Sequence, residues 1–489
     1  MAYELRLSVR GDARRKCITA PVAARVYGLR ASLLTLCVLV GLVGCEAEIT
    51  NPHDYLVRLK ERSGAPGVSA AVAVNGRIVF SEGIGSADVE SGLLQTGTTV
   101  HNIGSVSKVL TTVAVMQLVE QGKVQLDAEI QRYAPWFPRK GRPITLRQIL
   151  THTSGIRHYR ADELTRDNSN ILRHYETFEE STRFWRDDPL LFAPGARYAY
   201  SSFAFDLLQA VIESASSEPF EQYMRRHVFG PAGMVDTQFD VSQRKVSRRG
   251  WAYTQNKSSG RFQRALNEDV SYKYAGGGML STDEDLCKFG HALNTGVLLK
   301  PASIAAMYRL QLPKNLQRFK PGSLTEPPPA ASQALGFRIS ADSHGHVHVG
   351  HPGTVKGTVS NFFDYFEEDV TVAVYANYDD KGVNLADYAE GLAALFYAGK
   401  RQNSQAAVVS SSVRHLCGAR VNQFLTQTTA QRLTTECRDN PWVRRISERD
   451  VIKLMRRLAV EASYAKFIED LVAKPRHRFH RRLLLRHSR

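Results

Sequence analysis

Ser105 and Lys108 form a Ser-x-x-Lys pattern at the start of an apolar run that extends to Gly122. The apolar residues recur at helical spacing and glycine commonly ends a helix, so the run predicts a helix beginning near Ser105. Positions i and i+3 share one helix face, which brings the lysine amine within hydrogen-bond reach of the serine hydroxyl. The backbone N–H of a serine in a first helical turn can also bind an oxyanion. The pair predicts a serine nucleophile activated by a lysine; an ordinary surface serine and lysine is the alternative.

Tyr200 directly precedes a second apolar helical run, Phe205 to Ile212. From such a position a phenol can project into a site. A neighbouring lysine cation lowers the pKa of a tyrosine towards the range of a general base. The alternative is a core tyrosine without a catalytic role.

His351, Pro352 and Gly353 lie at the end of a predicted strand. Glycine there lets a substrate approach the backbone, and the N–H of Thr354 can supply a second oxyanion donor. His152, within Thr-His-Thr-Ser-Gly155, is a candidate base, but a histidine between hydroxyl residues before a glycine is more typical of a braced loop. His344, His346 and His348 alternate along one strand face; a metal site and a surface strand both explain them.

The elements that would position these residues predict an α+β fold. Two apolar runs, Pro66 to Val74 and Arg77 to Phe80, flank Asn75-Gly76, which is a strong hairpin signal. Residues 123–330 hold helical patterns broken by Pro and Gly. The sequence predicts four further strands, at 335–339, 346–349, 357–363 and 370–375, and the short loops between them indicate antiparallel pairing. Residues 385–397 are predicted to form a helix that closes the domain.

Three motifs follow one another in the chain: Ser105-Val-Ser-Lys108, Tyr200-Ser-Ser202 and His351-Pro-Gly353. Their order and separations resemble those of the class C β-lactamase-related serine hydrolases, a penicillin-binding-protein-like family. Connecting stretches at 150–155, 194–195 and 276–282 are similar too, and the resemblance covers residues 55–398. Within the family, residues 126–127, 133–135 and 154–159 look most like the mitochondrial serine β-lactamase-like protease and its bacterial relatives.

The resemblance implies a β-lactamase/transpeptidase-like antiparallel sheet flanked by helices, with an all-helical region inserted and the site in the cleft between them. It implies that Ser105 is the nucleophile, that Lys108 takes or relays its proton, and that Tyr200 is the base and later the acid. The amides of Ser105 and Thr354 would bind the oxyanion. By the same resemblance His351, Gly353 and Ser202 orient the substrate.

Two positions depart from the family pattern. Ser202 stands where lactamases have the asparagine that holds the substrate amide, and Pro352 replaces a hydroxyl residue that helps to grip a substrate carboxylate. Both departures favour a peptidase or esterase over a true β-lactamase. They also weaken the case for D-alanyl-D-alanine ends as substrates.

The net charge of +16 is concentrated at the two ends of the chain. Residues 1–45 hold 7 Lys and Arg against 2 Asp and Glu, and residues 401–489 hold 19 against 7, so residues 46–400 carry a net charge of −1. A nearly neutral body does not predict a nucleic-acid groove. No CxxC or Cys/His metal spacing is present, and we expect neither a metal nor a cofactor.

The first 45 residues resemble an export signal. Seven Lys and Arg precede an apolar run, Ala31 to Gly44, which is short for a membrane span, and Leu42-Val-Gly-Cys45 resembles a bacterial lipobox. We therefore expect a lipoprotein signal at 1–45, lipidated at Cys45 and anchored on the periplasmic or outer-membrane side. An uncleaved anchor, a plain signal and a mitochondrial presequence are the alternatives.

Residues 46–400 form the predicted catalytic domain, with the helical insert at roughly 123–330, and residues 401–489 a basic extension that is partly helical or disordered. Within that extension, Ser447 to Asp450 resembles a capping box that opens an amphipathic helix. Cys417 and Cys437 can pair or stay free, and Cys287 reads as a buried small hydrophobe.

The sequence thus predicts a membrane-anchored serine hydrolase that works through an acyl-enzyme on a small peptide or ester. A catalytically silent binding or sensing lipoprotein on the same scaffold is the first alternative. A membrane or nucleic-acid module built on the basic tail is the second.

Overall fold

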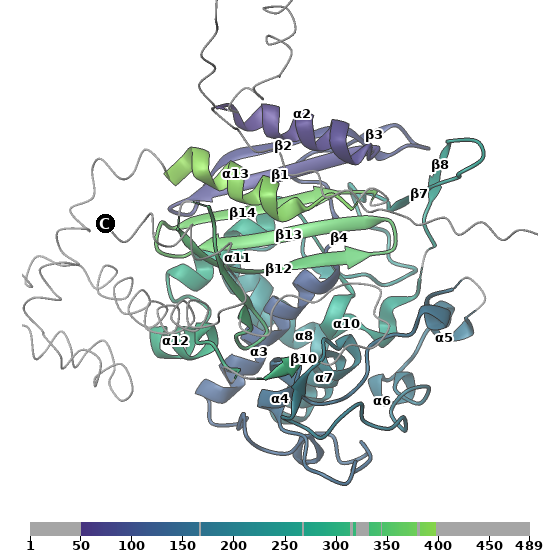
Figure 1. The fold of residues 1–489 in the computed structure, drawn as a ribbon, viewed down its shortest axis with the longest axis vertical. Helices are drawn as coiled ribbons and strands as arrows, with labels where there is room; N and C mark the ends of the chain where they lie inside the picture. Colours follow the sequence, from purple (N-terminus) through teal and green to yellow (C-terminus); the bar gives the residue numbers. More distant parts are fainter. Residues whose placement is uncertain are drawn as a thin grey trace, which may run out of the picture. The chain divides into compact units, whose positions relative to one another are not determined.

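A seven-stranded sheet carries the elements around the predicted site (Figure 1). The N-terminal part of the chain supplies β1 (Gly67–Val74), β2 (Arg77–Asp88) and β3 (Leu93–Leu94), and the C-terminal part supplies β11 (Arg338–Ala341), β12 (Val347–Val355), β13 (Thr358–Tyr365) and β14 (Val370–Ala376). The strand order is β11-β12-β13-β14-β1-β2-β3, and every neighbouring pair is antiparallel. The predicted α+β fold with an antiparallel sheet is confirmed.

The computed structural model describes residues 50–165, 168–266, 268–312, 316–318, 332–343, 345–378 and 382–397. The predicted signal with Cys45, the extension from 401 onward with Cys417 and Cys437, and His344 lie outside these residues. None of the helices within the described ranges has the length and apolar character that a bilayer span requires.

The predicted hairpin at Asn75-Gly76 is present. Val74 of β1 pairs with Arg77 of β2, so the connection has two residues, and both have positive φ, 50° at Asn75 and 75° at Gly76. Two successive left-handed residues match the twist of the flanking strands, which is why Asn-Gly is favoured there.

The sheet is buried on both faces near its centre. Along β1, Val68, Ala70 and Val72 pack towards α2 (Pro52–Ser63) and α13 (Leu385–Tyr397), while Ala71 and Ala73 belong to the larger core on the opposite face. Figure 1 shows α2 and α13 along one side of the sheet and α11 (Asp283–Asn294) on the other. A strand covered on both faces needs no polar alternation, which explains the continuous apolar run in β1.

The helix predicted after Ser105 is α3 (Ser107–Glu120), and a 3₁₀ turn, η1 (Gly104–Val106), holds Ser105 directly before it. The residues of α3 from Ser107 to Met116 are all buried. Two other helices reach the predicted site: α7 (Ser202–Ser216) and the short α10 (Tyr274–Gly277).

The inserted region contains further helices. They are α4 (Leu146–Leu150), α5 (Ser169–Leu172), α6 (Phe178–Ser181), α8 (Phe220–Met224), α9 (Gly230–Ala232) and α12 (Pro301–Tyr308), with the single turns η2 (Ile130–Arg132), η3 (Ala161–Leu164) and η5 (Val270–Tyr272) and the π-helical η4 (Arg225–Phe229).

The inserted region is mainly helical but also contains short strands. β5 (Arg197–Tyr198) pairs with β10 (Gln317–Arg318), and β7 (Tyr253–Gln255) with β8 (Phe262–Arg264). β6 (Gln238–Phe239) and β4 (His101–Asn102) both pair with β9 (Met279–Ser281). Because these strands have two or three residues, they leave no periodic signal in the sequence. The β4–β9 pair ties the glycine-rich segment before Met279 to the segment that leads into Ser105.

Ser201 is the N-cap of α7, and we predict that Ser201→Ala lowers the free energy of unfolding by about 1–3 kcal/mol. Its hydroxyl is fully buried, accepts from the N–H of Ala204 at 3.0 Å and donates to the carbonyl of Arg157 at 2.7 Å. Urea unfolding of the full chain measures the loss. Thr177→Ala, which removes the cap of α6 alone, is the control and should cost less. If Ser201→Ala lowers the free energy of unfolding by no more than Thr177→Ala does, the two buried hydrogen bonds of Ser201 do not stabilise the fold as we assign.

Candidate active site

Two of the three side chains predicted to carry the chemistry contact the hydroxyl of the third, Ser105. The hydroxyl oxygen of Ser105 is 2.8 Å from the phenol oxygen of Tyr200 and 3.2 Å from the amine of Lys108. Both distances are well inside the about 6 Å that a direct contact or one bridging water spans. Ser105 and Tyr200 are half-buried, whereas Lys108 is completely buried. The hydroxyl is thus near solvent, with the amine behind it.

The Lys108 amine is held by three oxygens. Besides Ser105, it donates to the hydroxyl of Ser202 at 2.9 Å and to the carbonyl of Gly276 at 2.5 Å. An ammonium has three N–H donors and no acceptor, so three acceptors match the protonated amine. The three oxygens come from η1, α7 and α10. The position of Lys108 therefore depends on how these elements pack.

The phenol of Tyr200 is tuned by its surroundings. Burial alone raises the pKa of Tyr200, but the charge and proximity of Lys108, the hydrogen bond with Ser105 and the charge of Arg338 together outweigh it. The net pKa of Tyr200 lies below its ordinary value. The Lys108 amine is also 5.0 Å from the centre of the phenol ring. A tyrosine with a lowered pKa beside a hydroxyl is suited to accept its proton.

Two glycines bring β12 against the segment before Ser105. Gly104 has a φ of 49°, and a Cβ atom there would lie 2.9 Å from the backbone nitrogen of Thr354. A Cβ atom at Gly353 would lie 2.1 Å from the carbonyl of Ile103 and 2.2 Å from the hydroxyl of Ser360. The backbones approach so closely at both places that neither position tolerates a side chain, and glycine is required there. Gly104 and Thr354 are therefore neighbours. The His351-Pro-Gly353 motif lies within β12 rather than at the end of a strand, since the strand continues to Val355.

Ser202, predicted to orient a substrate, points inward. It is 3 % exposed, its hydroxyl accepts from Lys108, and its N–H donates to the Nδ1 of His158 at 3.1 Å. In this structure Ser202 holds the lysine. His158 remains neutral at ordinary pH, because burial and then the charges of Lys108, Arg157 and Lys273 lower its pKa to about 3.

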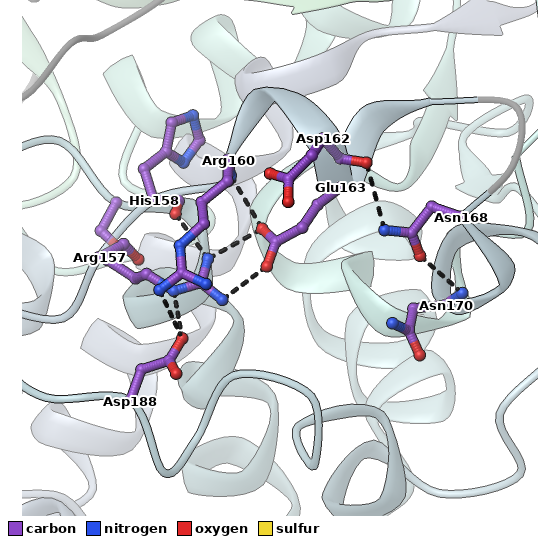
Figure 2. Close-up of polar contacts among 9 residues, drawn as sticks. Arg157, His158, Arg160, Asp162, Glu163, Asn168, Asn170 and Asp188 are labelled. Carbon is purple, nitrogen blue, oxygen red and sulfur yellow. Dashed lines mark hydrogen bonds and ion pairs between the residues drawn. The ribbon is translucent and has the colours of Figure 1, made fainter.

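An ion-pair network anchors the loop that carries His158. Arg157 is 7 % exposed and bonds with both oxygens of Glu163, at 2.8 and 2.6 Å, and with Asp188 at 2.5 Å (Figure 2). Its guanidinium also donates to the carbonyl of His158 at 3.0 Å. A planar guanidinium that bonds two carboxylates at once has a fixed orientation. The network thus orients the loop whose histidine contacts the start of α7.

His152 braces the segment around Tyr200. It is buried with a φ of 55°, its Nδ1 accepts from the N–H of Ser201 at 3.3 Å, and its ring centre is 4.4 Å from that of Tyr200. Burial and the nearby Lys108 and Arg338 charges lower its pKa well below the ordinary value. The bracing interpretation, not the catalytic one, fits this geometry.

His351 faces the site as a neutral ring. It is 1 % exposed, and its ring centre is 6.0 Å from that of Tyr200. Burial, together with the charges of Arg338 and Lys108, lowers the pKa of His351 well below its ordinary value. Its Nδ1 lies 2.6 Å from the carbonyl of Pro352, which can only accept, so Nδ1 carries the hydrogen. The buried Nε2 is then an acceptor, and no described residue bonds to it.

The sequence analysis did not single out two ionisable residues near the site, Arg338 and Asp206. Arg338 of β11 lies with its guanidinium carbon 6.0 Å from the centre of the Tyr200 ring, and no described carboxylate pairs with it. Asp206 of α7 is fully buried beside Gly276. A signal existed for Asp206, because it is the one acidic residue within the apolar run from Phe203 to Ile212.

The strand histidines that suggested a metal have other partners. His346 lies 2.5 Å from a carboxylate oxygen of Glu368, and His348 is 2 % exposed, with its ring 3.9 Å from that of Phe363. The surface-strand explanation is wrong for His348, since α13 covers this face. Among the residues with described side chains no group of three or more His, Cys, Asp or Glu is arranged to hold a metal ion.

Comparison with known proteins agrees with this geometry. The chain is 33% identical to the mitochondrial serine beta-lactamase-like protein LACTB of Homo sapiens over 312 residues, which are 51% of this chain and 57% of that protein. It is 28% identical to the putative penicillin-binding protein PbpX of Bacillus subtilis over 285 residues, 58% of this chain and 65% of that one. The chain thus matches little more than half of the length of the first relative. The predicted likeness to the mitochondrial protein and to bacterial relatives is confirmed.

The fold has a solved counterpart in the octameric penicillin-binding protein homologue from Pyrococcus abyssi. The two are 26% identical with a TM-score of 0.59, and the match covers 71% of this chain and 77% of the other. The family model described as Beta-lactamase matches residues 53–395, from α2 to α13 and well over half of the chain. A match of this extent, over a sheet and three motifs in the expected arrangement, means that the chain belongs to the beta-lactamase family.

Proposed function

We propose that this protein is a serine hydrolase that cleaves a peptide or an ester through an acyl-enzyme. The observation that carries the proposal is the contact of one half-buried hydroxyl, Ser105, with both the phenol of Tyr200 at 2.8 Å and the amine of Lys108 at 3.2 Å. Nucleophile and base within hydrogen-bond reach, with the base oriented by a third group, is the arrangement that nucleophilic catalysis requires.

In the first step the Ser105 oxygen attacks the substrate carbonyl and its proton passes to the Tyr200 oxygen. The lowered pKa of Tyr200, with the Lys108 charge as its main favourable cause against burial, supports the phenol as the base. The tetrahedral intermediate then expels the amine or alcohol, which takes the proton from Tyr200. Water attacks the acyl-enzyme by the same route and restores Ser105.

The oxyanion of the intermediate would be bound by the backbone N–H groups of Ser105 and Thr354. The close approach of Gly104 to Thr354 supports this pair, because it brings the two segments together without side chains between them. Two N–H groups on a tetrahedral oxygen are worth a large part of the acceleration in acyl transfer.

Substrate preference follows from what faces the site. Ser202 is buried on Lys108, and His351 offers a neutral ring with an acceptor at Nε2. Neither is suited to grip a carboxylate as the lactamase pattern does. This supports a peptidase or esterase over an efficient β-lactamase.

Arg338 adds a preference for a negatively charged substrate. Its guanidinium lies beside the Tyr200 ring, and its Nε is buried and bonded to none of the described residues. A buried N–H donor without an acceptor costs free energy, which a bound anion would recover. The site then contains two positive charges, those of Lys108 and Arg338, while the histidines around it are neutral. We infer that Arg338 receives a carboxylate or similar anionic group of the substrate.

The cellular location is a further part of the proposal. The lipobox-like Leu42 to Cys45 supports an exported protein anchored through a lipid at Cys45, and the mitochondrial relative supports the alternative. Both locations are compatible with the hydrolase chemistry.

We predict that Ser105→Ala lowers kcat/KM for p-nitrophenyl esters by at least about 10³-fold, because the nucleophile is lost. A fluorophosphonate probe should label the full-length wild-type chain and not this variant. Ser258→Ala, in the exposed loop between β7 and β8, is the matched control and should keep both activity and label. If the wild-type protein turns over no ester, and if Ser105→Ala binds ligand as tightly as the wild type does, the result would instead support a catalytically silent binding protein.

We predict that Arg338→Gln raises KM about 10- to 100-fold for a p-nitrophenyl hemisuccinate, which carries a free carboxylate, since a charged hydrogen bond is lost. The neutral p-nitrophenyl butyrate should change less than about threefold. Arg338→Lys should recover part of the loss, and the exposed Arg309→Gln should have no effect. Equal losses for the two esters would contradict anion binding by Arg338.

For the location, we predict that radiolabelled palmitate is incorporated into the chain expressed in a Gram-negative host. Cys45→Ala should abolish the incorporation, while Cys287→Ala should not, because Cys287 is buried in the catalytic body. Label retained by Cys45→Ala, or import by isolated mitochondria without lipid, would reject the lipoprotein assignment.

A further inference from the structure

Asp206 is a buried carboxyl connected to Lys108 through a single residue. It is 0 % exposed, and its Oδ1 accepts from the N–H of Gly276 at 2.7 Å. The carbonyl of the same glycine accepts from the Lys108 amine at 2.5 Å. The other carboxyl oxygen, Oδ2, is buried and has no hydrogen-bond partner among the described residues. The mechanism described above gives this carboxyl no role.

The placement of Asp206 follows from α7. Ser202 and Asp206 are four residues apart, so they lie on the same face of the helix. Both are buried towards α3 and α10, and each meets the lysine, Ser202 directly and Asp206 through Gly276. One helix face thus holds two of the groups that determine where the amine lies.

Two lysines supply the positive charge near Asp206. Lys108 of α3 and Lys273, directly before α10, favour the ionised carboxylate, as does the Gly276 N–H. Lys273 is itself paired with Glu268. Two phenols, the half-buried Tyr159 and the buried Tyr272, lie close enough to this carboxyl for its charge to raise their pKa values further above that of an exposed tyrosine.

Burial is the strongest influence on Asp206. It outweighs the two lysines and the glycine N–H and raises the pKa of Asp206 to about 7. The carboxyl is therefore mostly neutral below that pH and mostly ionised above it. An ordinary aspartate is already ionised near pH 4. A change of charge in the neutral range thus takes place one residue away from the amine.

We propose that Asp206 is a positioning residue that holds Lys108 through Gly276 and whose charge regulates the strength with which Lys108 activates Tyr200. This inference rests on the proposed hydrolase function. When Asp206 is neutral, the ammonium acts undiminished on the phenol and favours the phenolate. When Asp206 is ionised, its negative charge offsets part of that field, and deprotonation of Tyr200 requires a higher pH.

The test uses the full-length chain and two variants on α7. Asp206→Asn keeps an oxygen for the Gly276 N–H but removes the charge. Glu213→Gln removes a carboxylate from the same helix, where Glu213 bonds with Gln209 and Phe220 away from the lysine. The rate at which a fluorophosphonate probe modifies Ser105 is followed from pH 5 to 10, since this step needs the base and no turnover.

We expect the rising limb of the pH–rate profile to move to lower pH by about one unit in Asp206→Asn, because the variant has no negative charge to offset that of Lys108. Glu213→Gln should follow the wild-type profile. A merely structural role for Asp206 would lower the rate at every pH without moving the limb. If the rising limb of the Asp206→Asn profile lies at the same pH as that of the wild type, the proposal is overturned.

A second measurement is independent of the hydrolase function and of the folding of any variant. In wild-type chain labelled with ¹³C at the aspartate carboxyls, one signal should titrate near pH 7, and the amide of Gly276 should shift with the same midpoint. If that signal titrates near pH 4, or if the Gly276 amide does not follow it, the proposal is rejected. If the probe fails to react while both signals titrate together, the failure belongs to the proposed function and the Asp206–Gly276 link stands.

Discussion

The buried amine of Lys108 constrains the rest of the site. Three donors in an apolar interior need three acceptors, because each one left without a partner costs about 1–3 kcal/mol. Ser105, Ser202 and Gly276 supply them from η1, α7 and α10. Movement of any of these elements leaves a donor unpaired. The packing of η1, α7 and α10 around the amine is therefore also the condition for an ordered Ser105.

Neutral histidines lie near this charge and orient the segment that carries Tyr200. His152 and His158 accept the N–H groups of Ser201 and Ser202, directly after Tyr200. Burial lowers the pKa of each, and nearby cations lower it further. Rings kept neutral in this way can accept backbone hydrogen bonds without adding charge beside Lys108. The two imidazoles thus hold the residues that directly follow Tyr200, and the charge of Lys108 lowers the pKa of its phenol.

Local signals in the sequence were sufficient for much of the fold and for the three central residues. Asn75-Gly76 specified a hairpin through its own turn chemistry, and residues 385–397 formed the predicted helix because their apolar spacing is regular. Ser105 and Lys108 are neighbours on the chain. The position of Tyr200 directly before an apolar helical run makes it a candidate, but only the resemblance of its motif to that of a known family distinguishes it from a core tyrosine.

Other features arise where distant segments meet, and no local pattern contains them. The inward direction of Ser202 depends on its contact with Lys108, and the position of Arg338 beside the Tyr200 ring depends on the packing of β11. The burial of His348 follows from α13, which comes later in the chain. Short strands such as β4, β6 and β9 are stabilised by pairing with each other rather than by their own residues.

The central claim is that Ser105 becomes covalently acylated during turnover. Mass spectrometry of the full chain, quenched with acid within milliseconds of mixing with a p-nitrophenyl ester, tests it most directly. We expect a mass increase of one acyl group, located by proteolysis on the peptide that contains Ser105. Turnover of the ester without an adduct, or an adduct on another residue, would contradict the account.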